Sequence, residues 1–122
     1  MPTSAEHLEK ARHNEEFVTA LLAAHPKRFF DWALNGAFYA AVHYVEAVLA
    51  EVGYHSCDHG DRGRAAQRHF QQGYRPFRIL KDLSMRARYQ CAPVVPGDYE
   101  TVAGKHLAEI RRKVQAKIRA AP

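Results

Sequence analysis

Apolar residues recur along this chain with the spacing of helices, and no segment alternates in the way a half-buried strand does. Residues 30–52 carry the clearest pattern, in which an apolar stripe and a row of aromatic and polar residues lie on roughly opposite sides. Because this segment has little charge on any side, we expect it to be the central helix of a bundle. The apolar stripe is Phe30, Leu34, Ala37, Phe38, Ala41, Val45, Val48 and Val52, and the second row is Trp32, Asn35, Tyr39, His43 and Glu46.

Local signals place the ends of the other helices. Thr3 and Glu6 form a capping box at the start of the first helix. Gly53 can adopt the left-handed conformation that ends the second helix, and Pro76 suits a first helical turn. We therefore expect helices at about 4–24, 27–52 and 61–72, a fourth from about 75 and a last from 98, with loops at 53–60 and 92–97 and a break at Gly73.

Together these elements predict a single all-α domain over residues 1–122, an up-and-down four-helix bundle with one additional short helix. One acidic residue, Glu15, falls inside the apolar stripe of the first helix, where an unpaired carboxylate is costly. We expect Glu15 either to pair with an arginine such as Arg88 or to lie at the edge of the stripe.

Charge is distributed unevenly along the chain, whose net charge is +5. Residues 1–61 carry nine acidic and four basic side chains, whereas residues 62–88 carry eight basic and one acidic. Residues 105–122 add a further net charge of +5. A basic half of this kind either forms an electrostatic surface for a polyanion or faces the acidic half, within one chain or across a dimer.

Several features favour a cytoplasmic protein without membrane association. The first 25 residues contain glutamates and no apolar run, which argues against a secretory signal. The longest uncharged stretch is shorter than the roughly 20 residues of a membrane span. Cys57 and Cys91 are the only cysteines, as expected for two reduced thiols rather than a disulfide framework.

The central helix carries the run A-x-Y-A-A-x-H over residues 37–43, followed by His59 and Arg62 and later by Ala-Arg-Tyr at residues 87–89. In these residues the chain resembles the HEPN family (higher eukaryotes and prokaryotes nucleotide-binding). The resemblance implies a compact up-and-down helical bundle, commonly a homodimer, that often works on RNA. It also implies that catalytic members are metal-independent endoribonucleases without a cofactor, whose Arg-x(4–6)-His motif meets its mate at the dimer interface, while other members serve as binding or assembly modules.

Two versions of that motif end at His69, namely Arg64-x4-His69 and Arg62-x6-His69. Histidine, whose unperturbed pKa is about 6.5, can exchange the proton of a 2′-hydroxyl near neutral pH. Arginine can hold the scissile phosphate and stabilise its developing charge. Arg64 and His69 are therefore the candidate catalytic residues.

Further residues are candidates for an RNA-binding surface or pocket, because they combine aromatic rings with cations and imidazoles. The same residues have alternative explanations. Tyr39 and His43 can pack in the core or form the two-fold contact of a dimer, and Tyr89 can cover the core. The candidates are Arg62, His59, Tyr39, His43, Arg88 and Tyr89.

Imidazole and thiolate groups in the loop before the third helix suit zinc. A fourth ligand would have to come from Cys91, His43 or His69. The alternative is a structural loop with solvated histidines. The loop residues concerned are His55, Cys57 and His59, with Asp58 and Asp61 nearby.

Three functions follow from these observations. The first is RNA-related: a binding or toxin-type module, or an endoribonuclease, with RNA and an antitoxin or other protein as partners. The second is a noncatalytic interaction or dimerisation module whose pocket is structural. The third is a metal-dependent role of the loop at residues 55–59.

Overall fold

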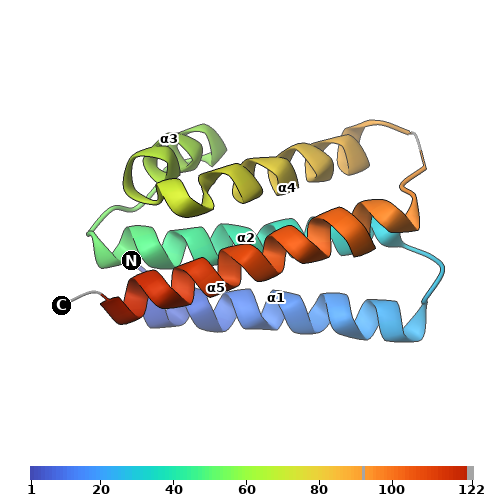
Figure 1. The fold of residues 1–122 in the computed structure, drawn as a ribbon, viewed down its shortest axis with the longest axis horizontal. Helices are drawn as coiled ribbons and strands as arrows, with labels where there is room; N and C mark the ends of the chain where they lie inside the picture. The colour runs from blue at the N-terminus through green and yellow to red at the C-terminus, as the bar shows by residue number, and fades with distance from the viewer. Residues whose placement is uncertain (92, 121–122) are drawn as a thin grey trace.

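The computed structural model describes residues 1–91 and 93–120, and these residues form helices and no strand. Four long helices run side by side, and a short one lies at one end (Figure 1). The predicted all-α bundle with one additional short helix is therefore confirmed. The elements are α1 (Ser4–Ala24), α2 (Phe30–Glu51), α3 (His59–His69), α4 (Gln71–Tyr89), the π-helical segment η1 (Asp98–Ala103) and α5 (Gly104–Ala120).

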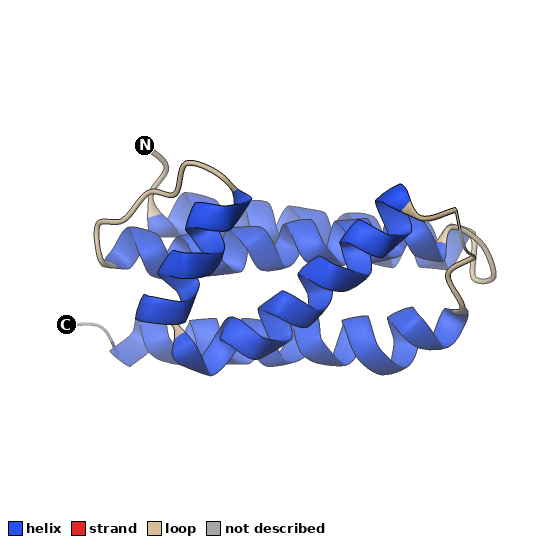
Figure 2. Cartoon of the chain, turned by 90° about the horizontal axis from the view of Figure 1, so that it is seen from above, coloured by secondary structure: helices blue, strands red, loops and turns tan. Residues whose placement is uncertain are grey.

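Helix α2 is the centre of the bundle, because α1, α4 and α5 all pack against it. Viewed from above, α4 crosses the bundle obliquely and α3 lies across its end (Figure 2). Most of α2 is buried, as its low charge predicts, and its apolar stripe forms the core with residues of the other helices. The largest fully buried side chains are Tyr44, Phe38, Phe70, Phe77, Leu34, Leu49, Leu80 and Ile110.

Helix α1 begins as predicted, because the Thr3 hydroxyl accepts from the Glu6 backbone and the Glu6 carboxylate accepts from the Thr3 backbone. Glu15 does pair with an arginine of the basic half, but the partner is Arg111 rather than Arg88. The Arg111 Nη1 donates to both carboxylate oxygens, at 3.1 and 3.0 Å. This ion pair links α1 to α5, which α1 otherwise does not approach closely.

Helix α2 begins three residues later than predicted. Phe29 stands before it in the left-handed region, with φ of 61°, and residues 27–29 lie outside the helix. At the other end Gly53 has φ of 77°, which confirms that the glycine ends the helix in the left-handed conformation.

The predicted boundary between the third and fourth helices is wrong. Helix α3 covers His59–His69 rather than 61–72, and α4 begins at Gln71 and runs through Gly73. A Cβ at position 73 would lie 2.1 Å from the Phe70 ring. Gly73 is therefore needed for the close approach of Phe70, which is fully buried, and not for a helix stop.

Because α4 begins earlier, Pro76 lies in its second turn and not in its first. A proline there has no N–H to donate to the carbonyl four residues earlier, which is that of Gln72. Lys113 of α5 fills this gap, since its Nζ lies 2.7 Å from the Gln72 carbonyl oxygen. The proline thus leaves a backbone acceptor that ties α4 to α5.

Two further expectations are tested by the described residues. Cys57 and Cys91 are both free and exposed, as predicted for a chain without a disulfide framework. Within residues 1–91 and 93–120, none of the helices has the length and apolar character needed to cross a membrane.

Candidate functional site

The polar and aromatic row of α2 is only half enclosed. Asn35 and Glu46 are buried and His43 is half-buried, as expected for a row that meets protein. However, Trp32 is 58% exposed and Tyr39 is 39% exposed. The row therefore combines a buried polar part with two aromatic rings that are open to solvent.

These rings line an open hollow of about 350 Å³ between α1 and α2, which we call the aromatic hollow. The α1 side is formed by residues three or four positions apart, which lie on one face of that helix. Among them Phe17 is 48% exposed. The aromatic hollow is lined by Lys10, Asn14, Phe17, Trp32, Asn35, Gly36, Tyr39 and His43.

Gly36 allows α1 and α2 to approach one another beneath this hollow. A Cβ at position 36 would lie 2.6 Å from Val18 Cγ2 and 3.0 Å from the Phe17 ring. Asn35, the neighbouring residue of the lining, is fixed by Ser84 of α4, whose hydroxyl donates to the Asn35 Oδ1 at 2.8 Å. The floor of the aromatic hollow is thus held from both neighbouring helices.

Arg88 of α4 borders the aromatic hollow. Its Nη1 donates to the Tyr39 hydroxyl at 3.3 Å, and its Nε to the Ser84 carbonyl at 3.4 Å. Its guanidinium carbon lies 5.2 Å from the centre of the Tyr89 ring and 5.9 Å from that of Phe38, distances at which cation–π attraction operates. Three of the predicted site residues, Tyr39, Arg88 and Tyr89, are therefore brought together.

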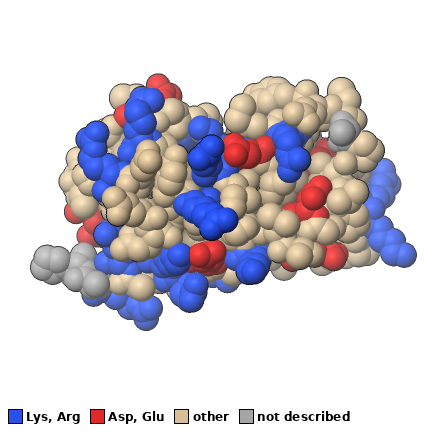
Figure 3. All heavy atoms as spheres, turned by 45° about the horizontal axis from the view of Figure 1, so that its top comes forward, with Lys and Arg blue, Asp and Glu red and all other residues tan. Residues whose placement is uncertain are grey.

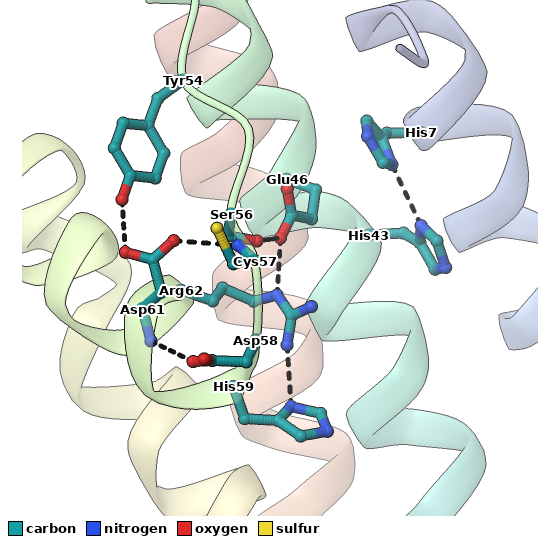
Figure 4. A network of polar contacts seen from close by, with 10 residues as sticks. All are labelled: His7, His43, Glu46, Tyr54, Ser56, Cys57, Asp58, His59, Asp61 and Arg62. Atoms are coloured by element: carbon teal, nitrogen blue, oxygen red, sulfur yellow. Dashed lines mark hydrogen bonds and ion pairs between the residues drawn. The ribbon is translucent and has the colours of Figure 1, made fainter.

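Arg62 and His59 belong instead to a polar network that joins α2 to α3 (Figure 4). The Arg62 Nε donates to the Glu46 carboxylate at 2.6 Å, and the two side chains are only 14% and 9% exposed. The Ser56 hydroxyl donates to the same carboxylate oxygen. Arg62 is thus engaged by protein and anchors α3, so it presents no free guanidinium.

The Arg62 Nη1 also lies 2.7 Å from the His59 Nδ1. Arginine can only donate, so this nitrogen accepts and the His59 ring is neutral with its proton on Nε2. Burial and the charges of Arg62 and Arg88 lower the pKa of His59, in agreement with that state. His59 therefore keeps one N–H available to a neighbouring acceptor.

The loop before α3 is held by its own carboxylates. Asp58 caps α3 by accepting from the Asp61 backbone at 2.8 Å. Asp61 accepts from the Tyr54 hydroxyl and from the Cys57 backbone. These two hydrogen bonds lower the pKa of Asp61, and the bond to its carboxylate raises the pKa of Tyr54. Hydrogen bonds to Asp58 and Asp61 therefore hold the loop against the start of α3.

A pair of histidines connects α1 to α2 beside the aromatic hollow (Figure 4). The Nδ1 atoms of His7 and His43 lie 3.1 Å apart, so one of them carries the proton that the other accepts. Burial, together with His7 and Lys10, lowers the pKa of His43 to about 4, and burial also lowers the pKa of His7. Both rings are neutral at pH 7 and can offer or accept hydrogen bonds.

Both residues of the predicted catalytic pair, Arg64 and His69, lie on the short helix α3. Arg64 is exposed and His69 is half-buried, with its ring centre 6.1 Å from that of Tyr54. Both lie on α3, where a spacing of five residues separates the directions of their side chains by about 140°. A phosphate between them would therefore need groups from a second protomer.

The described residues contain no group of three His, Cys, Asp or Glu side chains placed to hold a metal ion. His59 is bonded to Arg62, and both cysteines are exposed without a common partner. The metal-dependent role of the loop at 55–59 therefore lacks a ligand set in this part of the chain.

Sequence patterns missed the contribution of α1. His7, Lys10, Asn14 and Phe17 all face α2, although none of them belongs to the apolar stripe that the sequence predicts for the first helix, which is Leu8, Ala11, Val18 and Leu22. Phe17 was the available signal, because it is a large apolar residue outside that stripe.

Comparisons with protein-family models, with curated protein sequences and with solved structures give no match.

Proposed function

We propose that this protein binds single-stranded RNA, with bases stacking in the aromatic hollow. The observation that carries the proposal is the exposure of Phe17, Trp32 and Tyr39 around one open hollow. Lys10 belongs to its lining, and Arg88 donates to the Tyr39 hydroxyl at its edge. Proteins in water seldom expose several large rings next to one another unless these rings bind a partner. Proteins that bind single strands use such rings as stacking platforms.

The surrounding groups suit the rest of a nucleotide. Lys10 lies on the α1 side and Arg88 on the α4 side, where each can contact a phosphate. The neutral His43 and Asn14 offer hydrogen bonds to base edges or to a 2′-hydroxyl. This assignment agrees with the RNA-related role that the HEPN resemblance implies, and it uses Tyr39, His43, Arg88 and Tyr89 of the predicted surface.

Binding without cleavage is the form that we favour, because Arg64 and His69 diverge on α3. Incubation of labelled RNA with the protein in EDTA tests this preference. Intact RNA supports a binding module. Shortened RNA, if the cleavage disappears in His69→Ala, would instead assign the metal-independent endoribonuclease of the resemblance to a composite site between two protomers.

The experiment that tests binding is fluorescence anisotropy with a labelled single-stranded RNA. Trp32→Ala should weaken binding about tenfold, since stacking of one base contributes roughly 1–3 kcal/mol. Tyr39→Phe should change little, because it keeps the ring and loses only the hydroxyl that accepts from Arg88. Val52→Ala is the matched control, since Val52 is 52% exposed and lies outside the aromatic hollow. Equal affinities for Trp32→Ala and the control would refute the proposal.

A second candidate function rests on the same exposed rings. Phe17 and Trp32 are apolar anchors of the kind that dominate protein interfaces, so the aromatic hollow is also suited to a homodimer or to another protein. Light scattering of the native protein decides between the two. A native dimer that dissociates in Trp32→Ala would assign the hollow to association. A native protein with the mass of a single chain leaves the hollow open for RNA.

A further inference from the structure

A second hollow lies on a different side of the molecule, between α4 and α5. It is an open groove of about 1050 Å³, which we call the basic groove. Figure 3 looks onto the side of α4 and α5 and shows more Lys and Arg than Asp and Glu on that face. The groove is lined by Gln72, Arg75, Pro76, Ile79, Lys105, His106, Ala108, Glu109, Arg111, Arg112, Lys113 and Gln115.

Two of the five cations in this lining are engaged by the protein. Arg111 binds Glu15, and Lys113 donates to Glu109 at 2.7 Å and to the Gln72 carbonyl. Glu109 is the one acidic residue of the lining, and the bond from Lys113 lowers its pKa. Its carboxylate is therefore ionised, and Lys113 balances its charge. The bond from Lys113 to the Gln72 carbonyl joins α5 to α4, and the Arg111 pair joins α5 to α1.

The other three cations, Arg75, Lys105 and Arg112, are exposed and make no ion pair with the residues that the structure describes. The acidic half of the chain does not neutralise them, because its ion pairs with the basic half are Glu46 with Arg62 and Glu15 with Arg111. Ion pairing with the acidic half of the chain therefore does not explain the three cations of this groove.

The free cations are spaced along the groove. Lys105 and Arg112 are seven residues apart on α5, so they lie on the same side of that helix and about 10 Å apart along its axis. Arg75 stands on the α4 side. The lining from Lys105 to Gln115 spans about 15 Å, the length of roughly four phosphates in a stacked strand.

We propose that the basic groove binds a linear chain of phosphates. No Phe, Tyr or Trp ring lines the groove, so it has no platform for a base, and it recognises the charged chain alone. Guanidinium groups suit the oxygens of a phosphate because their N–H groups form a fork. The chain is either the sugar-phosphate backbone of a nucleic acid or inorganic polyphosphate. This proposal does not depend on base stacking in the aromatic hollow.

The test uses fluorescence anisotropy with a labelled abasic phosphodiester oligomer of about ten phosphates. The variant is Arg75→Gln/Arg112→Gln, and the matched control is Arg12→Gln/Arg68→Gln, which removes the same charge from exposed residues outside the groove. Both doubles are checked for helicity by circular dichroism. Lys105→Gln provides a single-residue variant with the same expected direction.

We expect the native protein to bind the abasic oligomer, and the groove double to lose at least tenfold in affinity while the control loses little. The slope of log K against log salt should fall by roughly 1.4 in the groove double, because each phosphate contact in a single strand contributes about 0.7. Trp32→Ala should leave this binding unchanged, which separates the groove from the aromatic hollow. Inorganic polyphosphate and the unlabelled oligomer are compared as competitors of the labelled oligomer. If polyphosphate displaces it at the lower phosphate concentration, polyphosphate is the source. If polyphosphate is the weaker competitor, the source is the nucleic-acid backbone.

Three results would overturn the inference. The first is no binding of the abasic oligomer. The second is an equal loss of affinity in the groove double and the control double, which would indicate that only the net charge matters. The third is binding of poly-glutamate of equal charge as tightly as the oligomer, which would indicate an acidic protein rather than a phosphate chain.

Discussion

The aromatic hollow and the basic groove use opposite chemistry in one small helical bundle. The hollow between α1 and α2 is small and lined by rings, amides and a neutral imidazole, with Lys10 as its one charged residue. The groove between α4 and α5 is three times as large by volume, about 1050 against 350 Å³, and is lined by five Lys or Arg residues. The first surface is suited to bases and the second to phosphates, which are the two parts of a nucleic acid that proteins recognise separately.

The difference arises from the partners of the helices. The central helix has few charged residues. On the side that α1 and α4 leave partly open, its exposed residues are therefore the aromatic Trp32 and Tyr39. Helices α4 and α5 are amphipathic, so their outward positions are charged, and the place where they meet collects cations from both. Variants that affect one surface and leave the other intact test this separation.

The largest effect is expected at the ion pair that anchors α3 beside α2. Glu46→Gln leaves the nearly buried Arg62 without its charged partner, so the free energy of unfolding should fall by about 3 kcal/mol. The double Glu46→Leu/Arg62→Met should be less destabilised than the single variant, because no charge is then left uncompensated. Urea denaturation measures both.

This variant also tests the separation of the two surfaces. Binding of the abasic oligomer to the basic groove should survive Glu46→Gln under conditions in which the protein remains folded, since none of the network residues lines the groove. A single variant that is as stable as the native protein would show that the pair contributes nothing to the fold.

A smaller effect, on the order of 2 kcal/mol, is expected from the histidine pair at low pH. The pKa of His43 is about 4 in the folded protein, mainly because of burial, and about 6.5 in an unfolded chain. Between these values the unfolded state binds more protons, so stability should decrease as the pH falls from about 6.5 to about 4 and should be constant above that range.

Denaturation midpoints at several pH values measure this dependence. In His43→Gln the decrease should be reduced, and the part that remains should come from His7, whose pKa is lowered by burial as well. Equal pH dependence in the native protein and in His43→Gln would contradict the burial of a neutral imidazole pair beside the aromatic hollow.

The smallest effects distinguish two glycines. Gly36→Ala places a methyl group 2.6 Å from Val18 and should destabilise the protein by about 1 kcal/mol, because crowding between α1 and α2 outweighs the better helix propensity of alanine. Gly63→Ala meets nothing within 4 Å and should stabilise α3 by up to about 1 kcal/mol. Thermal unfolding of both variants reports the two signs. A Gly36→Ala variant that is as stable as the native protein or more stable would mean that α1 and α2 are not in close contact at Gly36.

The sequence predicted the fold well, because the helical periodicity of 30–52 and the capping box at Thr3 are local signals. It predicted the row of Trp32, Tyr39 and His43 for the same reason. The boundary between α3 and α4 was missed because Gly73 has the signature of a helix stop, whereas its role is to make room for the Phe70 ring. That role depends on packing, which a local pattern does not contain.

The candidate site was predicted only in part, because its contacts join residues far apart in the chain. Glu46 and Arg62 are sixteen positions apart, and Arg88 and Tyr39 forty-nine. Nothing in the spacing indicated that Arg62 would form an ion pair with Glu46, or that His7 would form a hydrogen bond with His43. The motif of Arg64 and His69 was visible in the sequence, but α3 continues through both residues and turns their side chains apart.

The most direct test of the account is the fluorescence of Trp32, the single tryptophan of the chain, during titration with single-stranded RNA. Stacking of a base on its exposed ring predicts strong quenching with RNA and unchanged emission with the abasic oligomer, although both ligands bind. RNA that binds without any change in the emission of Trp32 would contradict the central claim that the aromatic hollow receives the bases.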